Sequence, residues 1–304
     1  MRFISRLLCA TLILCSSVYA EEFRKEQGII HAFEKGDDYA LSSEILQYID
    51  KYPSTSETAL YLHDLMNLSE IIGFEKVREE LLKITEYKSD NVIGEAVRRK
   101  AYEYLSEIEF RMRYSDKNRF VEIYRPVSTW YISPLFNKYG RGDILFDFGD
   151  ESRPRPDKAA KNAYVESDGY LNPGKWISGE TGVVYSHALI EIPENAHLRV
   201  ESDGEYILFF NGVRTADNLY GEKKRASSRL FKCNGKGTSV ITIKTFVKGT
   251  LFRLTLEDSG GRPIQPVELS RDKAYGNSTI TEIDDQILSE LKSRTDSTDK
   301  ELYL

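Results

Sequence analysis

Five side chains in the second half of the sequence have the types needed to bind a sugar. Sugar recognition requires an aromatic ring for the CH face of the pyranose, together with a few polar groups for its hydroxyls. These types occur at two turn-rich positions and in the loop after one apolar run, at Trp176, Tyr220, Asn211, Arg214 and Asp217. Three of them also suit structural roles, Asn211 in a turn, Trp176 in a core and Arg214 on a solvated surface. The sequence therefore proposes a ligand site here and leaves a structural role open.

No pattern in the sequence predicts a catalytic group, a metal site or a cofactor. Ser186 and His187 are adjacent in a predicted strand, where neighbouring side chains point to opposite faces, so they do not form a nucleophile and base pair. The 4 histidines lack a spacing that would place two of them and a carboxylate on one helical face. Asp143, Asp147 and Asp150 lack the alternating pattern of a calcium loop. We therefore expect no enzyme, although a hydrolase with paired carboxylates stays an alternative.

Residues 1–20 have the three parts of a secretory signal. Arg2 and Arg6 precede an apolar run, and small Ala20 ends the segment at a cleavage site. We expect cleavage before Glu21 and export to the periplasm or the outer surface. The apolar run is shorter than the roughly 20 residues that cross a bilayer, so no integral membrane span is expected in the mature chain.

The cysteines bear on anchoring and on disulfides. Cys15 ends a run that resembles a bacterial lipobox, but that pattern wants a small residue before the cysteine and finds Leu14. A lipid anchor at Cys15 is therefore the less favoured alternative. Because Cys9 also lies in the leader, Cys233 is alone in the mature chain and no internal disulfide can form. Its alternating apolar surroundings predict a buried structural thiol.

The overall composition bounds the classes of partner. The chain has 304 residues, and 40% hydrophobic with 30% charged residues is an ordinary globular composition with room for two domains. Its formal net charge is −6. Nucleic acids and anionic membranes both attract concentrated basic surfaces, so this charge argues against either partner.

The first half of the mature chain has helical periodicity. Apolar residues recur at intervals of three and four, and Pro53 is the only proline before Pro126. The pattern predicts a short helix that stops near Gly36, followed by helices over 39–52, from about 56 to 73, over 74–87 and over 92–114.

One part of this region resembles a known repeat. A helix ending in Lys51-Tyr52-Pro53, a serine-rich turn, Ala59 and a leucine-rich helix closed by Gly73 are similar to one degenerate tetratricopeptide-type hairpin. The resemblance implies a concave surface that binds a peptide or a protein. Three clean copies, which an independent solenoid would need, are not found. An irregular helical bundle therefore remains an equal alternative.

The second half alternates short apolar runs with turn signals. Strands are predicted over 143–148, 183–192, 197–202, 205–210, 228–233, 239–247 and 250–257. Asp203-Gly204 and Asn211-Gly212 are typical of type I′ turns, so residues 197–214 are predicted to form two hairpins end to end. Strands at this spacing without intervening helices favour antiparallel sheets packed face to face.

The order of these strands resembles the jelly-roll modules of the galactose-binding-like superfamily. The similarity covers about Trp130 to Pro266 and rests on the opening WYISPLFN, on GEYILFFNGVR and on KGTSVITIKTFVKGTLFRLTLEDSGGRPI. It implies a sugar-binding β-sandwich of bacterial envelope proteins, some of which carry helical repeats before the module and a transglutaminase-like domain after it. No Cys, His and Asp region follows the module here, so we expect no transferred enzymatic activity.

Together these patterns predict an α+β protein of two domains. The leader covers 1–20, a repeat-like helical domain 21–125, an antiparallel β-sandwich 126–269, and a polar segment 270–304 with an amphipathic helix over 280–291. The expected function is that of an exported, non-catalytic binding or scaffolding protein of the bacterial envelope, with a glycan or a protein as ligand. The alternative is an accessory subunit or fragment of a larger envelope enzyme, transglutaminase-like or glycoside hydrolase-like.

Overall fold

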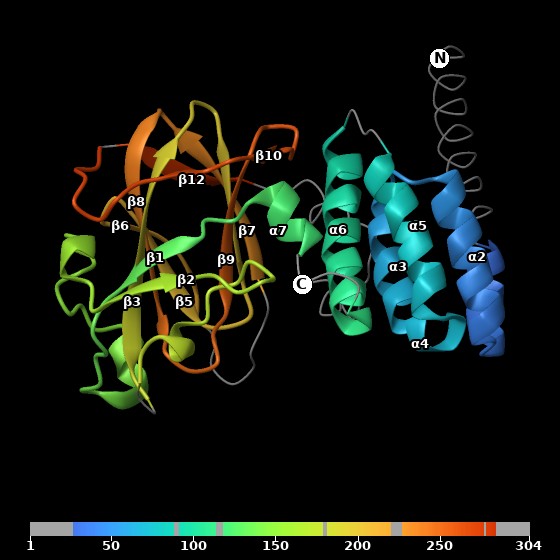
Figure 1. Cartoon of the computed structure of the whole chain (residues 1–304), viewed down its shortest axis with the longest axis horizontal. Helices are drawn as coiled ribbons and strands as arrows, with labels where there is room; N and C mark the ends of the chain where they lie inside the picture. Colours follow the sequence, from blue (N-terminus) through green and yellow to red (C-terminus); the bar gives the residue numbers. More distant parts are fainter. Residues whose placement is uncertain are drawn as a thin grey trace, which may run out of the picture.

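The computed structural model describes residues 27–87, 91–113, 118–178, 181–219, 227–276 and 278–283. The predicted leader, Cys15 and Tyr220 lie outside these ranges. No helix within them combines the length and the apolar character that crossing a membrane requires. The described chain has a helical part and a part made of two antiparallel sheets, which lie side by side (Figure 1).

The first part of the chain is helical, as its periodicity predicts. Residues 27–35 are helical and are followed by α2 (Asp38–Lys51), α3 (Ser56–Asn67), α4 (Ser69–Ile72), α5 (Phe74–Glu86), α6 (Val92–Met112) and α7 (Arg119–Tyr124). The predicted helix from 56 to 73 is divided at Leu68, whose backbone ends α3 and begins α4. α7 was not predicted, because its 6 residues are too few to show a period.

α6 presents two different faces. Val97, Ala101 and Leu105 are fully buried and pack in a core with the other helices. Arg99 and Ser106 are also buried, yet they are polar and face away from that core, toward α7 and the sandwich. α6 therefore joins the two parts of the molecule, and Figure 1 shows α7 between it and the sheets.

The second part of the chain is a β-sandwich, which confirms the prediction of antiparallel sheets packed face to face. The larger sheet has the order β2-β1-β3-β8-β5-β6, with β11 beside β3, and the smaller has the order β10-β9-β4-β7-β12. The strands of the larger sheet are β1 (Thr129–Ile132), β2 (Lys161–Tyr164), β3 (Val183–Ile192), β5 (Tyr206–Phe210), β6 (Val213–Asn218), β8 (Gly237–Phe246) and β11 (Val267–Glu268). Those of the smaller sheet are β4 (His197–Ser202), β7 (Ser227–Asn234), β9 (Phe252–Glu257), β10 (Pro263–Ile264) and β12 (Thr279–Ile283).

The alternation along the smaller sheet separates a core face from an outer face. Leu198 and Val200 of β4 are fully buried between the sheets. Arg199 and Glu201 of the same strand point the other way. They bond to charged groups on β9 and α6, so the helical part covers this outer face through polar contacts.

The turn at Asn211-Gly212 forms the hairpin that the sequence predicts. Both residues have positive φ, 50° and 82°, and they join β5 to β6. Asn211 tolerates this conformation better than most residues, and Gly212 adopts it without steric cost. The local sequence therefore determines this part of the fold.

The predicted hairpin at Asp203-Gly204 is wrong. β4 pairs with β7 and β9, whereas β5 pairs with β6 and β8, so the chain crosses between the sheets here. Within the described backbone, neither residue has the positive φ of a type I′ turn. The Asp203 carboxylate accepts a hydrogen bond from Leu251 N at 2.5 Å, and Ser202 Oγ accepts one from Gly204 N at 3.1 Å. These contacts hold a crossover in place of the turn.

Two further predictions of local structure are wrong. Residues 143–148 do not form a strand, because the Asp143 carboxylate accepts the backbone N–H groups of Lys138 and Tyr139 and stabilises the 3₁₀ helix η1 (Gly140–Ile144). Within the predicted helix at 280–291, residues 280–283 belong to β12 instead, because they pair with the edge of β7, and residues 284–291 lie outside the described ranges. Two short 3₁₀ turns, η2 (Pro156–Lys158) and η3 (Pro173–Lys175), lie in the loops around β2.

A buried lysine fastens the 144–155 segment over the outer face of the larger sheet. Lys244 of β8 is fully buried, and its ammonium donates to Phe146 O and to Glu151 Oε1, both at 2.6 Å. On the neighbouring strand, His187 contacts Thr242 Oγ1 through Nδ1 at 2.9 Å, and burial lowers its pKa to about 3. The imidazole of His187 is therefore neutral at physiological pH.

The glycine of the β5–β6 turn provides a test of the fold. A Cβ on Gly212 would lie 2.6 Å from Ser152 O, whereas one on Gly235, which also has positive φ, would meet nothing closer than 4.0 Å. Both alanine variants lose about 1–2 kcal/mol from backbone strain. Gly212→Ala is expected to lose about 1–3 kcal/mol more, because the turn must move away from Ser152. Urea unfolding measures both, and equal losses would contradict the packing described.

Candidate functional site

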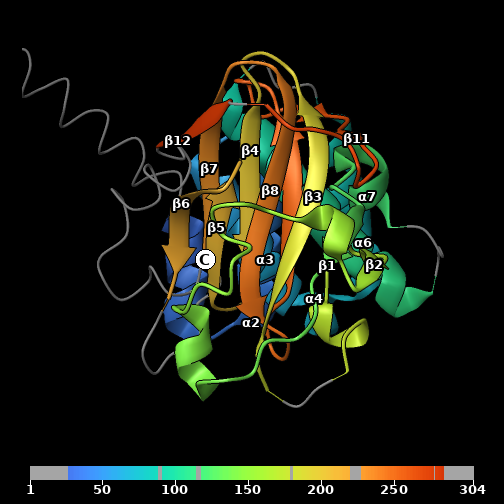
Figure 2. The same cartoon turned by 90° about the vertical axis from the view of Figure 1, so that its left-hand side faces the viewer.

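The structure does not bring together the residues that the sequence proposes as a ligand site. Trp176 is half-buried, and its ring packs against Tyr164 of β2 with centroids 5.9 Å apart. Arg214 and Asp217 lie on β6, the other edge of the larger sheet, and pair with each other at 2.7 Å. Figure 2 shows β2 and β6 on opposite sides of the sandwich. The width of the sheet therefore separates Trp176 from the other two.

Asn211 supports the turn in which it lies. Its Nδ2 donates to Ser278 O at 2.8 Å, and its Oδ1 accepts a hydrogen bond from Val240 N at 2.8 Å. The side-chain amide thus ties the β5–β6 turn to β8 and to the segment that precedes β12. Ligand binding at the sequence-proposed residues stays a prediction.

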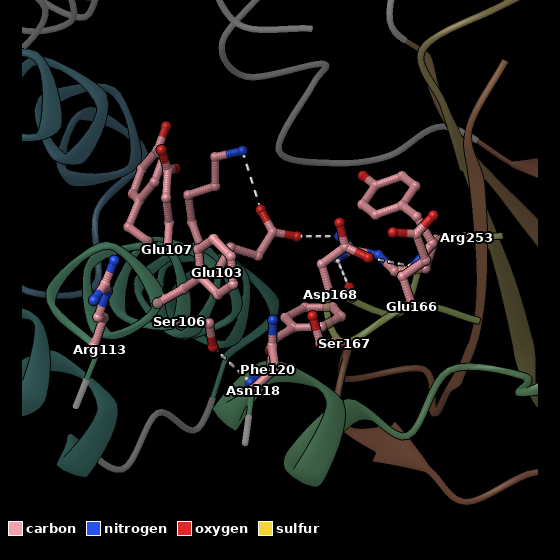
Figure 3. Close-up of a pocket in the computed structure, with 14 residues that line it drawn as sticks. Glu103, Ser106, Glu107, Arg113, Asn118, Phe120, Glu166, Ser167, Asp168 and Arg253 are labelled. Carbon is pink, nitrogen blue, oxygen red and sulfur yellow. Dashed lines mark hydrogen bonds and ion pairs between the residues drawn. The ribbon is translucent and has the colours of Figure 1, made fainter. Parts of the chain in front are cut away.

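A pocket of about 760 Å³ lies between the helical part and the sandwich (Figure 3). α6 forms one wall, and the loop over residues 166–170 forms the other. Phe120 of α7 and Arg253 of β9 lie between these walls. The volume falls within the range of roughly 300–1,000 Å³ that is typical of sites for small ligands.

One face of α6 supplies most of the first wall. Lys100, Glu103, Tyr104, Glu107 and Phe110 line the pocket, and their spacing of three and four residues places them on the same side of the helix. Phe110 is 72% exposed, so its ring is available to a ligand at the rim. α6 therefore contributes cationic, anionic and aromatic groups along a single line.

The loop that forms the second wall is held in one conformation. Glu166 N donates to Tyr170 O at 2.8 Å, Gly169 N donates to Glu166 O at 2.9 Å, and the Asp168 carboxylate accepts a hydrogen bond from Tyr170 N at 3.0 Å. Gly169 has a φ of 83°, and a Cβ there would lie 2.6 Å from Pro126. The carboxylates of this loop thus reach the pocket from a fixed backbone.

Arg253 lies at the contact between the two walls. Its Nε donates to Glu201 Oε2 at 2.7 Å, and its Nη2 donates to Glu103 on α6. The guanidinium lies over the Phe120 ring at 3.9 Å and the Tyr170 ring at 4.5 Å from the centroids. Cation–π contacts and two ion pairs therefore fix this buried charge in one orientation.

Arg99 repeats this arrangement from the helical side. Its Nη2 donates to Glu201 Oε2 at 2.8 Å and to Thr255 Oγ1 at 3.3 Å. Its guanidinium stacks on Phe120 and Tyr124 of α7, at 4.9 and 4.8 Å from the ring centroids. Glu201 thus binds one arginine from each part of the molecule.

Two part-buried carboxylates at the pocket, Glu201 and Glu103, are ionised at neutral pH. Burial alone would raise the pKa of Glu201, but Arg253 and Arg99 outweigh it and hold the pKa well below its usual range. Burial would also raise the pKa of Glu103, but the nearby charges of Lys100 and Arg253 outweigh this effect and lower it. Glu103 in turn raises the pKa of Lys100. Both carboxylates therefore remain ionised.

Two tyrosines keep their phenol groups neutral beside these charges. Burial raises the pKa of Tyr104 to about 12, and its hydroxyl contacts His63 Nδ1 at 3.0 Å. Burial also raises the pKa of Tyr170. With Phe110 at the rim, they provide ring surfaces and hydroxyl groups that can hydrogen-bond a polar ligand.

Within the described ranges, no group of three His, Cys, Asp or Glu side chains could hold a metal ion. The three aspartates that were compared with a calcium loop in the sequence have separate structural roles. Asp143 accepts a hydrogen bond from Tyr139 N at 2.8 Å, Asp147 accepts one from Gly149 N at 2.6 Å, and Asp150 pairs with Arg155 at 2.6 Å.

The pocket residues were missed in the sequence for a physical reason. Glu103 and Arg253 are far apart along the chain, and only the docking of α6 onto β9 brings them together. The charged residues on α6 have the spacing of an ordinary solvated helix face, which is the commoner explanation of such a pattern. The occurrence of Tyr104 and Phe110 among these charged residues is the feature of the sequence that could have indicated a pocket, and it is a weak indication.

Comparisons with known proteins give limited similarity. No protein-family model matches the chain, and no curated protein matches it. The β-glucosidase of Kluyveromyces marxianus in complex with glucose is 6% identical over 43% of this chain and 15% of its own, with a TM-score of 0.28. The PA14 domain of the antifreeze protein MpAFP is 11% identical over 51% of this chain and 89% of its own, with a TM-score of 0.28. The PA14 sugar-binding domain from an RTX adhesin is 15% identical over 50% of this chain and 76% of its own, with a TM-score of 0.22. At these TM-scores the likenesses establish neither the fold nor the ligand of this chain.

The paired charges at the docking surface make stability sensitive to Glu201. Glu201→Gln leaves Arg99 and Arg253 buried with one negative partner fewer, and we expect a loss of about 3 kcal/mol at neutral pH. Asp217→Asn removes half of an exposed pair and should cost about 0.5 kcal/mol or less. Urea unfolding of the two variants provides the comparison.

The same variant should alter the pH dependence of stability. The pKa of Glu201 is lower in the folded chain than its usual value of about 4.3, so its contribution is present above that pH and is lost as pH falls toward the folded pKa. The difference in unfolding free energy between the wild type and Glu201→Gln should therefore shrink below about pH 4. If the difference in unfolding free energy between the two proteins stayed constant down to the pH of acid unfolding, the lowered pKa of Glu201 would be contradicted.

Proposed function

We propose that this chain is an exported, non-catalytic binding protein that holds a glycan in the pocket between α6 and the 166–170 loop. The observation that carries the proposal is the exposed Phe110 ring beside fixed carboxylates, with Tyr104 and Tyr170 in the same pocket. Rings of this kind pack on the CH face of a sugar, and carboxylates accept hydrogen bonds from its hydroxyls.

The ionisation states support binding in preference to glycoside hydrolysis. A hydrolase needs one carboxyl group with a raised pKa to act as a general acid. Glu103 in this pocket has the opposite property, because Lys100 and Arg253 lower its pKa. Glu103 is therefore ionised, and it would accept hydrogen bonds from sugar hydroxyls without donating a proton.

Export and a place in the bacterial envelope are part of the same proposal. They are supported by the secretory features of residues 1–20 and by the galactose-binding-like pattern in the second half of the sequence. We take the sandwich to be a jelly-roll of that type, supported by the way β3, β5 and β8 alternate with β4, β7 and β9 between the sheets. The paired helices α2 and α3 support a tetratricopeptide-like origin for the helical part.

Replacing the exposed ring at the rim tests the proposed site. Phe110→Ala should weaken glycan binding about tenfold, equivalent to 1.4 kcal/mol, because the sugar loses its stacking surface. Phe33→Ala is the matched control, since Phe33 is 73% exposed, against 72% for Phe110, and lies in the first helical segment. Binding is screened on a mixed glycan array and then measured by calorimetry with the strongest ligand.

Three outcomes would contradict this assignment of the site. The first is an absence of binding to every glycan tested. The second is an equal effect of the Phe110 and Phe33 variants. The third is loss of binding in Asp217→Asn or Trp176→Ala but not in Phe110→Ala, which would return the site to the residues that the sequence proposed.

A further inference from the structure

The charged groups in the pocket are largely neutralised by partners within the chain. Lys100 Nζ donates to Glu103 Oε2 at 3.2 Å, and the same carboxylate pairs with Arg253. Arg253 is also paired with Glu201, which binds Arg99 as well. The centre of the pocket thus holds three cationic and two anionic side chains in one network, in which each cation is paired with a carboxylate.

The two walls follow the same pattern toward the rim. Glu107 pairs with Arg111 at 2.5 Å on α6, and Glu166 pairs with Lys175 beyond the loop. The remaining charged residues of the lining, Arg113 and Asp168, contribute one charge of each sign. Except at these two residues, a charged ligand would have to displace an internal partner to gain a full ion pair.

We infer that the ligand is an uncharged, hydroxyl-rich oligosaccharide, and this inference rests on the proposed glycan-binding function. Hydroxyl groups hydrogen-bond carboxylates and guanidinium groups without separating existing ion pairs. An anionic or cationic sugar polymer loses hydration on entering the pocket and finds the counter-charges there already engaged, apart from one of each sign at Arg113 and Asp168. The internal pairing thus selects against both signs of charge.

The hydrogen-bonding groups that remain match this ligand. Each carboxylate has about four acceptor positions, so Asp168 retains capacity after accepting the backbone bond from Tyr170. Asn118 uses its Oδ1 to accept a hydrogen bond from Val121 N at 3.2 Å, which leaves its Nδ2 as a donor in the lining. The pocket therefore offers both hydrogen-bond donors and hydrogen-bond acceptors, and a sugar hydroxyl can bond to either.

The test compares oligosaccharides that differ in charge. Probes are the hexamer of N-acetylglucosamine, its deacetylated cationic form, a neutral glucose hexamer and an anionic galacturonate hexamer. Calorimetry on the full chain at about 50 and about 500 mM NaCl separates ionic from non-ionic binding. We expect a neutral hexamer to bind at least tenfold more tightly than the charged ones, with a change of less than about twofold between the two salt concentrations.

The outcomes separate this inference from the function on which it rests. Preferred binding of a charged hexamer, weakened about tenfold by salt, would overturn the inference and leave glycan binding standing. Binding of no hexamer, together with no signal on the mixed array, would overturn both. Equal binding of neutral and charged hexamers would also overturn the inference, since the internal pairs would then exert no selection.

A charge variant provides a second measurement on a folded protein. Lys175→Gln removes the partner of Glu166 at an exposed position, so little stability is lost. The freed carboxylate should improve binding of the cationic hexamer severalfold and leave the neutral hexamer unchanged. The matched control is Lys232→Gln, because Lys232 is an exposed lysine of β7 outside the lining. Equal behaviour of the two lysine variants would contradict the role given to internal pairing.

Discussion

The buried guanidinium of Arg253 is the constraint on which the relative position of the two parts depends. Moving a charge out of water costs several kcal/mol unless it is paired and hydrogen-bonded. Glu201 supplies one partner from the neighbouring strand, and Glu103 supplies the other from α6. Arg99 on α6 has the same requirement, and its Nη2 donates to Glu201 on the sheet. Other docking angles would leave at least one of these buried charges unpaired, so the ion pairs specify how the helices lie on the sheet, and the position of the pocket follows.

The smaller sheet carries two functions on its two faces. Inward residues such as Leu198 and Val200 hold the sandwich together by excluding water. Outward residues of the same strand hold the helices, and Arg199 is itself paired with Glu257 across to β9. Because strand geometry alternates the two sets, neither requirement compromises the other.

The sequence predicts those features that depend on neighbouring residues. Helix positions follow from apolar periodicity, and the turn at Asn211-Gly212 follows from the backbone freedom of those two residues. Asp203-Gly204 has the same local chemistry, yet its contacts with Ser202 and Leu251 produce a crossover between sheets. Tertiary contacts decide between these outcomes, and they are not visible in a short stretch of sequence.

The candidate site shows the same limit more strongly. Aromatic and polar residues in the sandwich loops were sound guesses from their types, but Trp176 and Asp217 lie at opposite edges of the larger sheet. The pocket instead combines a helix face with a loop and a strand from the other part of the chain. Its existence depends on long-range docking, which composition and spacing do not encode.

Cys233 gives the sandwich a built-in reporter of its own motion. It is the only cysteine after residue 20, it lies buried in the core between the sheets, and burial raises the pKa of its thiol to about 12. A thiol reagent can reach it only while β7 separates from the opposing sheet, because the reactive thiolate is suppressed in the closed state. Its rate of alkylation therefore follows the opening of the β-layers, separately from any event in the helices.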